Sequence, residues 1–239
     1  MSQIFSILLY KPLFNILILL YNFIPPHDLG ISVIILTLFV RILISPLSIK
    51  SFKTQKALSE LQPKIKEIQA KYKGNTQKQN EEVMKIYKEG RANPLSGCLP
   101  MLIQLPIFIA LFQILRGLAN PNQFSNLYSF VSHPGILNTS FLGILDLAQR
   151  NRILAVLAGL FQFIQSKMIS SLTGKPKGKS TGSQTDQMSQ MMTKQMTYLM
   201  PIFLVFIYWK LPSALSLYWI IITLFSIGEQ YYINKKVKT

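Results

Sequence analysis

The chain has 239 residues, of which 49% are hydrophobic and 14% charged, with 25 Lys and Arg against 9 Asp and Glu. This composition argues against an ordinary soluble domain and indicates a membrane protein that crosses the bilayer several times. The basic excess is typical of cytoplasmic loops, so we expect no nucleic acid as direct cargo. The single cysteine, Cys98, excludes an internal disulfide. No Cys–His cluster predicts a metal site, and we expect no cofactor.

Residues 1–28 predict an N-terminal helix at the outer face of the membrane. Lys11, Asn15 and Asn22 are spaced four and seven apart, which places them on one helical face. Such a stripe suits a helix that lies flat in the membrane interface. Residues 4–24 are also apolar enough to span, and this alternative stays open. The start MSQIFSILLYK has no basic residue before its apolar stretch and no cleavage site after it, so we expect no cleaved signal peptide.

Residues 29–50 predict the first span, and Arg41 lies near the middle of its apolar run GISVIILTLFVRILISPLSI. A charge at the bilayer midplane costs about 2.5 kcal/mol or considerably more, depending on how much water reaches it. The candidate spans hold no acidic residue in their central stretches, and Glu229 lies at a segment end. We therefore expect a hydrated pocket that contains one unpaired positive charge. Thr37 lies one turn before Arg41 on the same face.

Residues 51–92 predict a cytoplasmic helical hairpin. One arm carries an apolar seam, and Gly74 with Asn75 supplies the turn. The seam consists of Leu58, Leu61, Ile65, Ile68 and Tyr72. Pro63 should kink the first arm or restart its helix. Two interpretations stay open: a solvated spacer, or a docking surface for partners.

Residues 93–239 predict four further spans, a flexible cytoplasmic linker at 173–187 and a short basic tail. The spans are Leu99–Leu115, Ile153–Ile169, Met196–Trp209 and Leu211–Tyr231. The third of these four rises only about 21 Å against about 30 Å of hydrocarbon, which favours local thinning of the bilayer. The fold class is therefore all-α, a polytopic membrane protein with five transmembrane helices.

The distribution of basic residues predicts the orientation of the chain. Lysines and arginines crowd the segments 50–93 and 167–194 and the tail, whereas the segment 117–149 has none. Because basic loops stay in the cytoplasm, we expect the N-terminus outside and the C-terminus in the cytoplasm of a bacterial plasma membrane.

Several polar side chains accompany Arg41 at membrane depth. They are Gln104, Gln162, Gln165, Trp219 and Thr223. A single glutamine or threonine in a span more often links neighbouring helices, at about 1 kcal/mol or less, than serves a function. The arginine differs, since its burial is too costly for a structural role without a partner.

Four segments resemble the family of YidC-type membrane protein insertases, with their mitochondrial and chloroplast relatives. They are LTLFVRILISPLS, LQPKIKEIQAKYK, NPLSGCLPMLIQLPIF and LSLYW. These segments match the family in residue type, order and spacing, from about residue 29 to the end. The resemblance implies five helices around a hydrophilic groove that opens to the cytoplasm and to lipid and is closed to the outside. The family's groove arginine matches Arg41, and its substrate-contacting positions match Thr37 and Trp219. Gln104 and Gln162 match further positions, and Gln165 competes for the second of these.

The resemblance implies insertion and folding of small membrane proteins, without bond-making chemistry, so we expect no enzyme. Its partners would be nascent membrane protein clients and the lipid bilayer, together with the Sec translocon, the signal recognition particle pathway and the ribosome. We expect the short form of the family, because the sequence shows neither the large outer domain of some members nor the lipoprotein cysteine of others. The tail INKKVKT is short, so we expect weak tethering of ribosomes by it.

Two other functions fit the residues. A secondary transporter could use Arg41 as its anion-binding site, and it would need access from both sides of the membrane. A chaperone for the assembly of mature membrane proteins would form stable complexes and depend little on Arg41. Cysteine accessibility on the outer side of Arg41 discriminates the transporter from an insertase.

Overall fold

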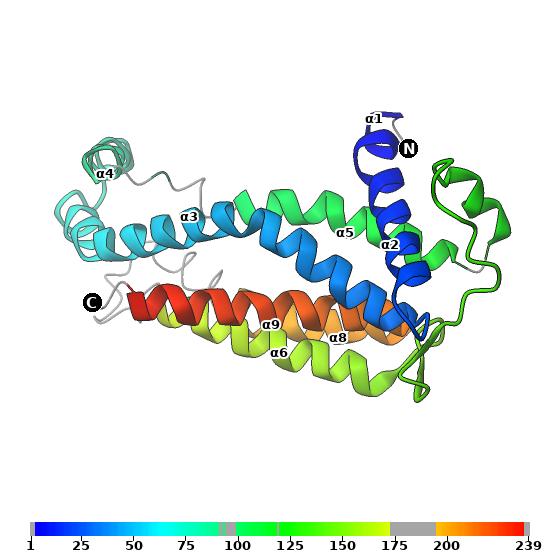
Figure 1. Ribbon diagram of the computed structural model, residues 1–239. Coiled ribbons are helices and arrows are strands. Elements are labelled where there is room, and N and C mark those ends of the chain that lie inside the picture. Colours follow the sequence, from blue (N-terminus) through cyan, green and yellow to red (C-terminus); the bar gives the residue numbers. More distant parts are fainter. Residues whose placement is uncertain (1–2, 91–92, 94–98, 119, 173–194, 237–239) are drawn as a thin grey trace.

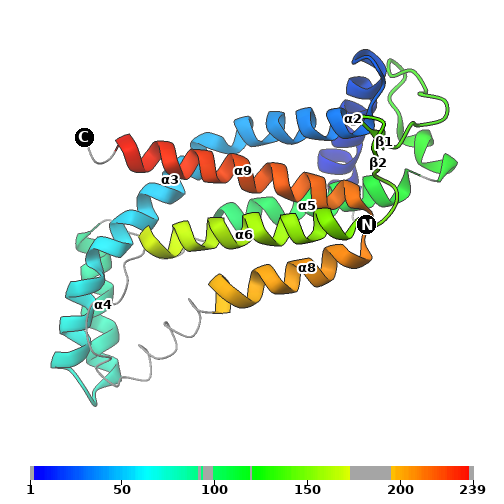
Figure 2. The same ribbon diagram turned by 90° about the horizontal axis from the view of Figure 1, so that it is seen from below.

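The computed structural model describes residues 3–90, 93, 99–118, 120–172 and 195–236. The predicted linker at 173–187 and most of the motif NPLSGCLP lie outside these residues. Five helices run roughly along one direction and form a bundle (Figures 1 and 2). They are α3 (Leu29–Lys71), α5 (Leu99–Gly117), α6 (Arg152–Leu172), α8 (Met200–Lys210) and α9 (Ser213–Lys236), and a π-helical turn η4 (Gln195–Leu199) leads into α8.

Among the described residues, three helices are long and apolar enough to cross a bilayer: Gln3–Phe23, α3 and the stretch Arg152–Ser170 within α6. The apolar helix Leu102–Gly117 is shorter. Large apolar side chains are exposed along the bundle, and Phe206 on α8 is 68% exposed. A soluble monomer rarely exposes a large contiguous apolar surface, whereas a lipid-facing surface needs no cover.

Helix α3 continues without a break through Pro46 and Pro63 into the predicted hairpin. Of the two outcomes expected at Pro63, a restarted helix is wrong, because one helix of 43 residues contains it. The helix bends along its length instead (Figure 2). A proline removes one backbone donor, and a long helix accommodates that loss by bending when its neighbouring turns are intact.

Helix α4 (Thr76–Glu89) returns beside the end of α3, at one end of the bundle (Figure 1). The turn between them uses Gly74 at φ 97°, a conformation that costs glycine little. The side chain of Asn75 caps α4 by accepting a 3.0 Å hydrogen bond from the backbone N–H of Lys78. Gln79 donates a 2.7 Å hydrogen bond to the carbonyl of Gln69, which joins the two arms.

The opposite end of the bundle holds a layer of short elements. These are α1 (Gln3–Phe5), the π-helical turn η1 (Ser6–Tyr10), α2 (Lys11–Phe23), the 3-10 helix η3 (Pro121–Asn126), β1 (Ser140–Phe141) and β2 (Leu145–Asp146). The two strands pair antiparallel, Ser140 with Asp146 and Phe141 with Leu145. Asp28 fastens this layer to α3, since it accepts hydrogen bonds from the N–H groups of Ile31 (2.9 Å) and Leu142 (2.6 Å).

Helix α2 crosses the end of the bundle transversely (Figure 1). Phe14, Leu17 and Ile18 are fully buried against the bundle. The polar stripe was expected to face the membrane interface, and for Asn15 this is wrong. Asn15 is 1% exposed and bonds to the loop that follows α5, donating to the carbonyl of Asn126 (3.1 Å). Asn15 and Asn22 therefore serve tertiary contacts, because the loop has backbone groups that need partners.

Candidate functional site

Two adjacent residues of α9, Tyr218 and Trp219, form hydrogen bonds with α5 and α6. The indole N–H of Trp219 donates a 2.9 Å hydrogen bond to Gln162 on α6. The amide of Gln104 on α5 donates a 2.6 Å hydrogen bond to the hydroxyl of Tyr218. Three of the predicted site residues, Trp219, Gln162 and Gln104, are thus partners in contacts between helices. Such contacts are the usual role of polar side chains in membrane bundles.

Arg41 reaches the same part of α9 from α3. Its side chain is 9% exposed, and Nη2 donates one long hydrogen bond of 3.4 Å to the backbone carbonyl of Ile222. Its Nε is buried, and no described residue offers it a hydrogen-bond partner. In the part of the chain that the structure describes, no carboxylate lies within salt-bridge distance of Arg41; the ion pair found there joins Lys85 and Glu82 on α4. A buried Nε without a partner is costly, and the single long hydrogen bond of Nη2 does little to offset that cost.

Arg41 forms no salt bridge among the described residues, but an acidic residue lies in its surroundings. Ser45, one turn further along α3, donates a 2.5 Å hydrogen bond to Glu229 on α9. Arg41 interacts electrostatically with Glu229 and with Tyr218, although no salt bridge forms. The sequence placed Glu229 at a segment end, but α3 and α9 run side by side in the same direction (Figures 1 and 2). This packing brings the carboxylate to the α3–α9 interface.

Thr37 lies one turn before Arg41 and is 2% exposed. Its hydroxyl donates a 2.6 Å hydrogen bond to the carbonyl of Val33, within its own helix. Thr223 on α9 does the same with the carbonyl of Trp219, at 2.7 Å. Both hydroxyls keep lone pairs that can accept from a ligand.

Trp219 also lies in an aromatic cluster. Its ring meets Phe108 on α5 edge to face at 5.8 Å and Tyr208 on α8 at 5.9 Å. Phe108 lies 6.3 Å from Tyr218. Edge-to-face pairs contribute about 0.5–1.5 kcal/mol beyond their buried area. The cluster therefore holds Trp219 between α5, α6 and α8, where its ring orientation is fixed.

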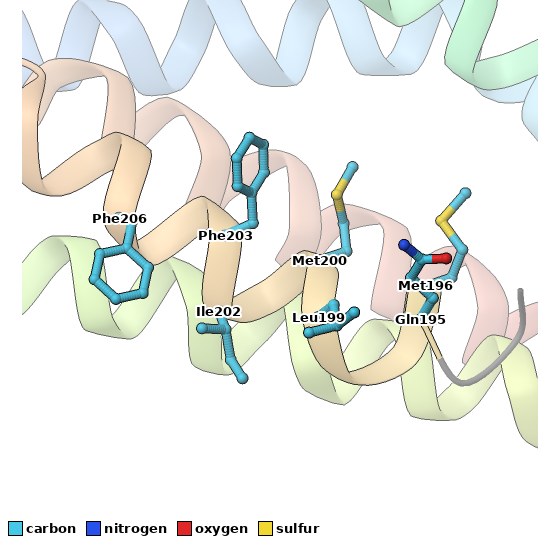
Figure 3. Close-up of a pocket in the computed structure, with 7 residues that line it drawn as sticks. All are labelled: Gln195, Met196, Leu199, Met200, Ile202, Phe203 and Phe206. Carbon is cyan, nitrogen blue, oxygen red and sulfur yellow. The ribbon is translucent and has the colours of Figure 1, made fainter. Parts of the chain in front are cut away.

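Two cavities lie outside this region. A cavity of about 610 Å³ lies along η4 and α8 (Figure 3). In Figure 3 the side chains of Met200 and Phe203 point one way, while Ile202 and Phe206 point away from them. A second cavity, of about 390 Å³, lies at the end of the bundle near His133. Neither of these cavities is lined by Arg41.

Comparison with known proteins identifies the family of this chain. The model of the family described as "60Kd inner membrane protein" matches residues 19–239. The chain belongs to this family. It is accordingly a membrane protein of a kind found in bacteria.

Three curated relatives carry the name "Membrane protein insertase YidC". That of Endomicrobium trichonymphae is 36% identical over 231 residues, which cover 95% of this chain and 39% of the relative. That of Oceanobacillus iheyensis is 36% identical over 214 residues, covering 86% and 74%. That of Fusobacterium nucleatum subsp. nucleatum is 34% identical over 209 residues, covering 87% of each. The chain thus spans 39% of the length of the first relative and most of the other two.

Within this family member, the structure adds residues that sequence reasoning left out. Tyr218 is the partner of Gln104, and Glu229 faces α3. The sequence offered a signal that Tyr218 belongs to the site, because this residue directly precedes Trp219 in the motif LSLYW. The sequence offered no such signal for Glu229, because a charged residue near the end of an apolar run ordinarily faces water.

Proposed function

We propose that this chain inserts small membrane proteins from the cytoplasmic side and helps them to fold. The observation that carries the proposal is Arg41, a buried guanidinium with one long hydrogen bond inside an apolar bundle. Ionisable residues at such positions mark binding pathways in membrane proteins. The relatives that match most of this chain are named membrane protein insertases, which supports the same function.

We propose that α3, α5, α6, α8 and α9 are the five spans. The α3–α4 hairpin would then be cytoplasmic, with the N-terminus outside and the C-terminus inside. The lysines of the hairpin and the end of α9 lie at one end of the bundle, which supports this orientation (Figure 1). Helix α2 lies across the other end, so we propose that it rests in the outer interface.

The client-binding residues of the proposal are Arg41, Thr37, Gln104, Gln162 and Trp219, lining a hydrated groove. The acidic group of a client's outer tail would be attracted by Arg41, and a low local dielectric enlarges that attraction relative to water. The polar side chains would hydrate the tail partway across. The bilayer beside α8 would be thin, since η4 and α8 together cover 16 residues, about 24 Å.

The client's apolar segment would then move sideways into lipid. Removal of apolar surface from water contributes about 25 cal/mol per Å², which drives transfer without a nucleotide. The α3–α4 hairpin is the proposed docking surface for the Sec translocon, the signal recognition particle pathway or the ribosome. Its lysine-rich arms support contact with acidic partners.

Depletion of the protein with rescue by variants tests the proposal. Insertion would be measured for two clients that differ only in an acidic or an amide residue in the outer tail. Arg41→Ala should lower insertion of the acidic client by about tenfold, the effect of losing one charge-assisted contact of about 1.4 kcal/mol, and affect the amide client less. Arg41→Lys, which keeps the charge, should restore part of the loss.

A photo-crosslinker at Thr37 or Trp219 should capture the arrested client helix in the same experiment. A matched crosslinker at Leu224, which is 42% exposed on α9, should capture mainly lipid. Normal insertion of both clients by Arg41→Ala and Arg41→Glu, or equal capture at all three positions, would contradict the proposed groove.

A further inference from the structure

Glu229 lies beside the groove arginine without forming a salt bridge to it. Its Oε1 accepts the 2.5 Å hydrogen bond from Ser45, one helical turn beyond Arg41 on α3. The two charges interact electrostatically across the α3–α9 interface. The carboxylate therefore lies on the hairpin side of the arginine, the side from which a client would arrive.

The charged atoms of this pair are only partly satisfied. The Nε of Arg41 and the Oε2 of Glu229 are buried and have no hydrogen-bond partner among the residues that the structure describes. The next residue, Gln230, is 1% exposed, and both polar atoms of its amide also lack partners within the described part of the chain. Buried polar atoms without partners cost about 1–3 kcal/mol each, so the surroundings of Arg41 and Glu229 are suited to receive an additional polar ligand.

We propose that Glu229 is a specificity-determining residue, an internal counter-charge that competes with a client's acidic group for Arg41. The inference rests on the proposed insertase function. With no client present, Glu229 offsets part of the arginine's positive potential. A client carboxylate must displace this interaction, whereas a neutral tail gains nothing from Arg41. Glu229 therefore lowers the occupancy of the site by weakly acidic clients.

Glu229→Gln tests this role with little change of shape, because glutamine keeps an oxygen that accepts from Ser45. Insertion would again be compared for the acidic client and its amide counterpart. The variant should raise insertion of the acidic client roughly threefold to tenfold relative to the amide client. A change of this size lies within the range of interaction free energies measured between neighbouring residues. The increase should vanish in the Arg41→Ala background, since the competition requires the arginine.

Two variants serve as matched controls. Glu229→Asp keeps the negative charge and should keep the wild-type ratio of the two clients. Ser45→Ala removes the hydrogen bond but leaves both charges, so it should change both clients alike. If Glu229→Gln does not accumulate in the membrane, Glu229→Ala carries the same comparison, because it leaves no buried amide in need of a partner.

An equal change of both clients by Glu229→Gln, or an increase that persists in Arg41→Ala, would overturn the inference. Failure of the proposed function looks different. In that case Arg41→Ala itself would leave both clients unchanged, whatever Glu229 does.

Discussion

Trp219 on α9 donates a 2.9 Å hydrogen bond to Gln162 on α6, which ties a proposed client-contacting side chain to a neighbouring helix. The contact is half-buried, and Gln162 has a weaker second interaction with Ser166 at 3.3 Å. The aromatic contacts with Phe108 and Tyr208 further restrict the indole ring. A client would therefore meet a fixed aromatic surface at this point, and binding would require little additional ordering.

A double-mutant cycle should detect the Trp219–Gln162 hydrogen bond. Trp219→Phe and Gln162→Leu each remove one partner while keeping an apolar side chain of similar reach. We expect a coupling free energy of about 0.6–1.7 kcal/mol, the range of hydrogen bonds between membrane helices. Reversible unfolding in mixed micelles measures it. Additive effects of the two substitutions would show that the two side chains contribute independently.

The close approach of α6 and α8 depends on Gly159. A Cβ at this position would lie 2.2 Å from Cγ2 of Val205 and 3.1 Å from the carbonyl oxygen of Pro201. Gly159→Ala should therefore destabilise the protein by about 1–3 kcal/mol, as overpacking does. Thermal denaturation in detergent measures the change.

Gly228 on α9 provides the matched control, since a Cβ there meets no atom of the described residues within 4 Å. Gly228→Ala should be neutral or slightly stabilising, because alanine restricts the unfolded chain. Val205→Ala should recover part of the loss in Gly159→Ala by removing the nearest clashing atom. Equal melting temperatures for Gly159→Ala and Gly228→Ala would contradict the packing argument.

Asn15 should be needed to hold the loop after α5 against α2. Besides its bond to Asn126, it accepts a 2.7 Å hydrogen bond from the N–H of Tyr128. Asn15→Ala leaves these half-buried backbone groups without their side-chain partner, so we expect a loss of about 1 kcal/mol. Limited proteolysis of segment 120–151 and thermal denaturation report the loosening.

Asn22 is the comparison for Asn15, because it is on the same helix and makes one hydrogen bond at an exposed site, to the carbonyl of Ser132. Asn22→Ala should cost well under the loss at Asn15. The opposite order of the two effects would show that the loop is held by its apolar contacts.

Stability should fall in acid through Asp146, which lies in the connection between α5 and α6. Hydrogen bonds from the hydroxyl of Thr139, the N–H of Ala148 and the amide of Gln149 hold the pKa of Asp146 below its ordinary value. A carboxyl with a depressed folded-state pKa stabilises the fold above the unfolded-state pKa, about 3.9, and loses this contribution as pH falls through the folded value.

Unfolding measured between about pH 5 and pH 2 tests this dependence. Asp146→Asn should show a smaller loss of stability in that window than the wild type, because its side chain cannot take up a proton. Thr139→Val, which removes the first of the donors, should also flatten the dependence. An acid slope in Asp146→Asn equal to that of the wild type would assign the loss to other carboxyls.

Much of the helical content followed from local pattern. The apolar runs around Arg41, in 99–115 and in 153–169 are helical, because long apolar segments satisfy their backbone hydrogen bonds internally. The turn at Gly74 and Asn75 also followed from residue type, since glycine adopts positive φ and asparagine caps helices. The depth of Arg41 within its run was equally a property of the sequence alone.

The tertiary structure decided which side chains meet. The pairing of Ser45 with Glu229 joins residues 184 positions apart, and that of Gln104 with Tyr218 joins residues 114 apart. Such contacts depend on the rotation and axial offset of each helix, and these are set by packing over whole helix surfaces. A periodic pattern gives the face on which a residue lies. It does not give the residue that the face will meet, and for this reason the countercharge beside Arg41 emerged only from the fold.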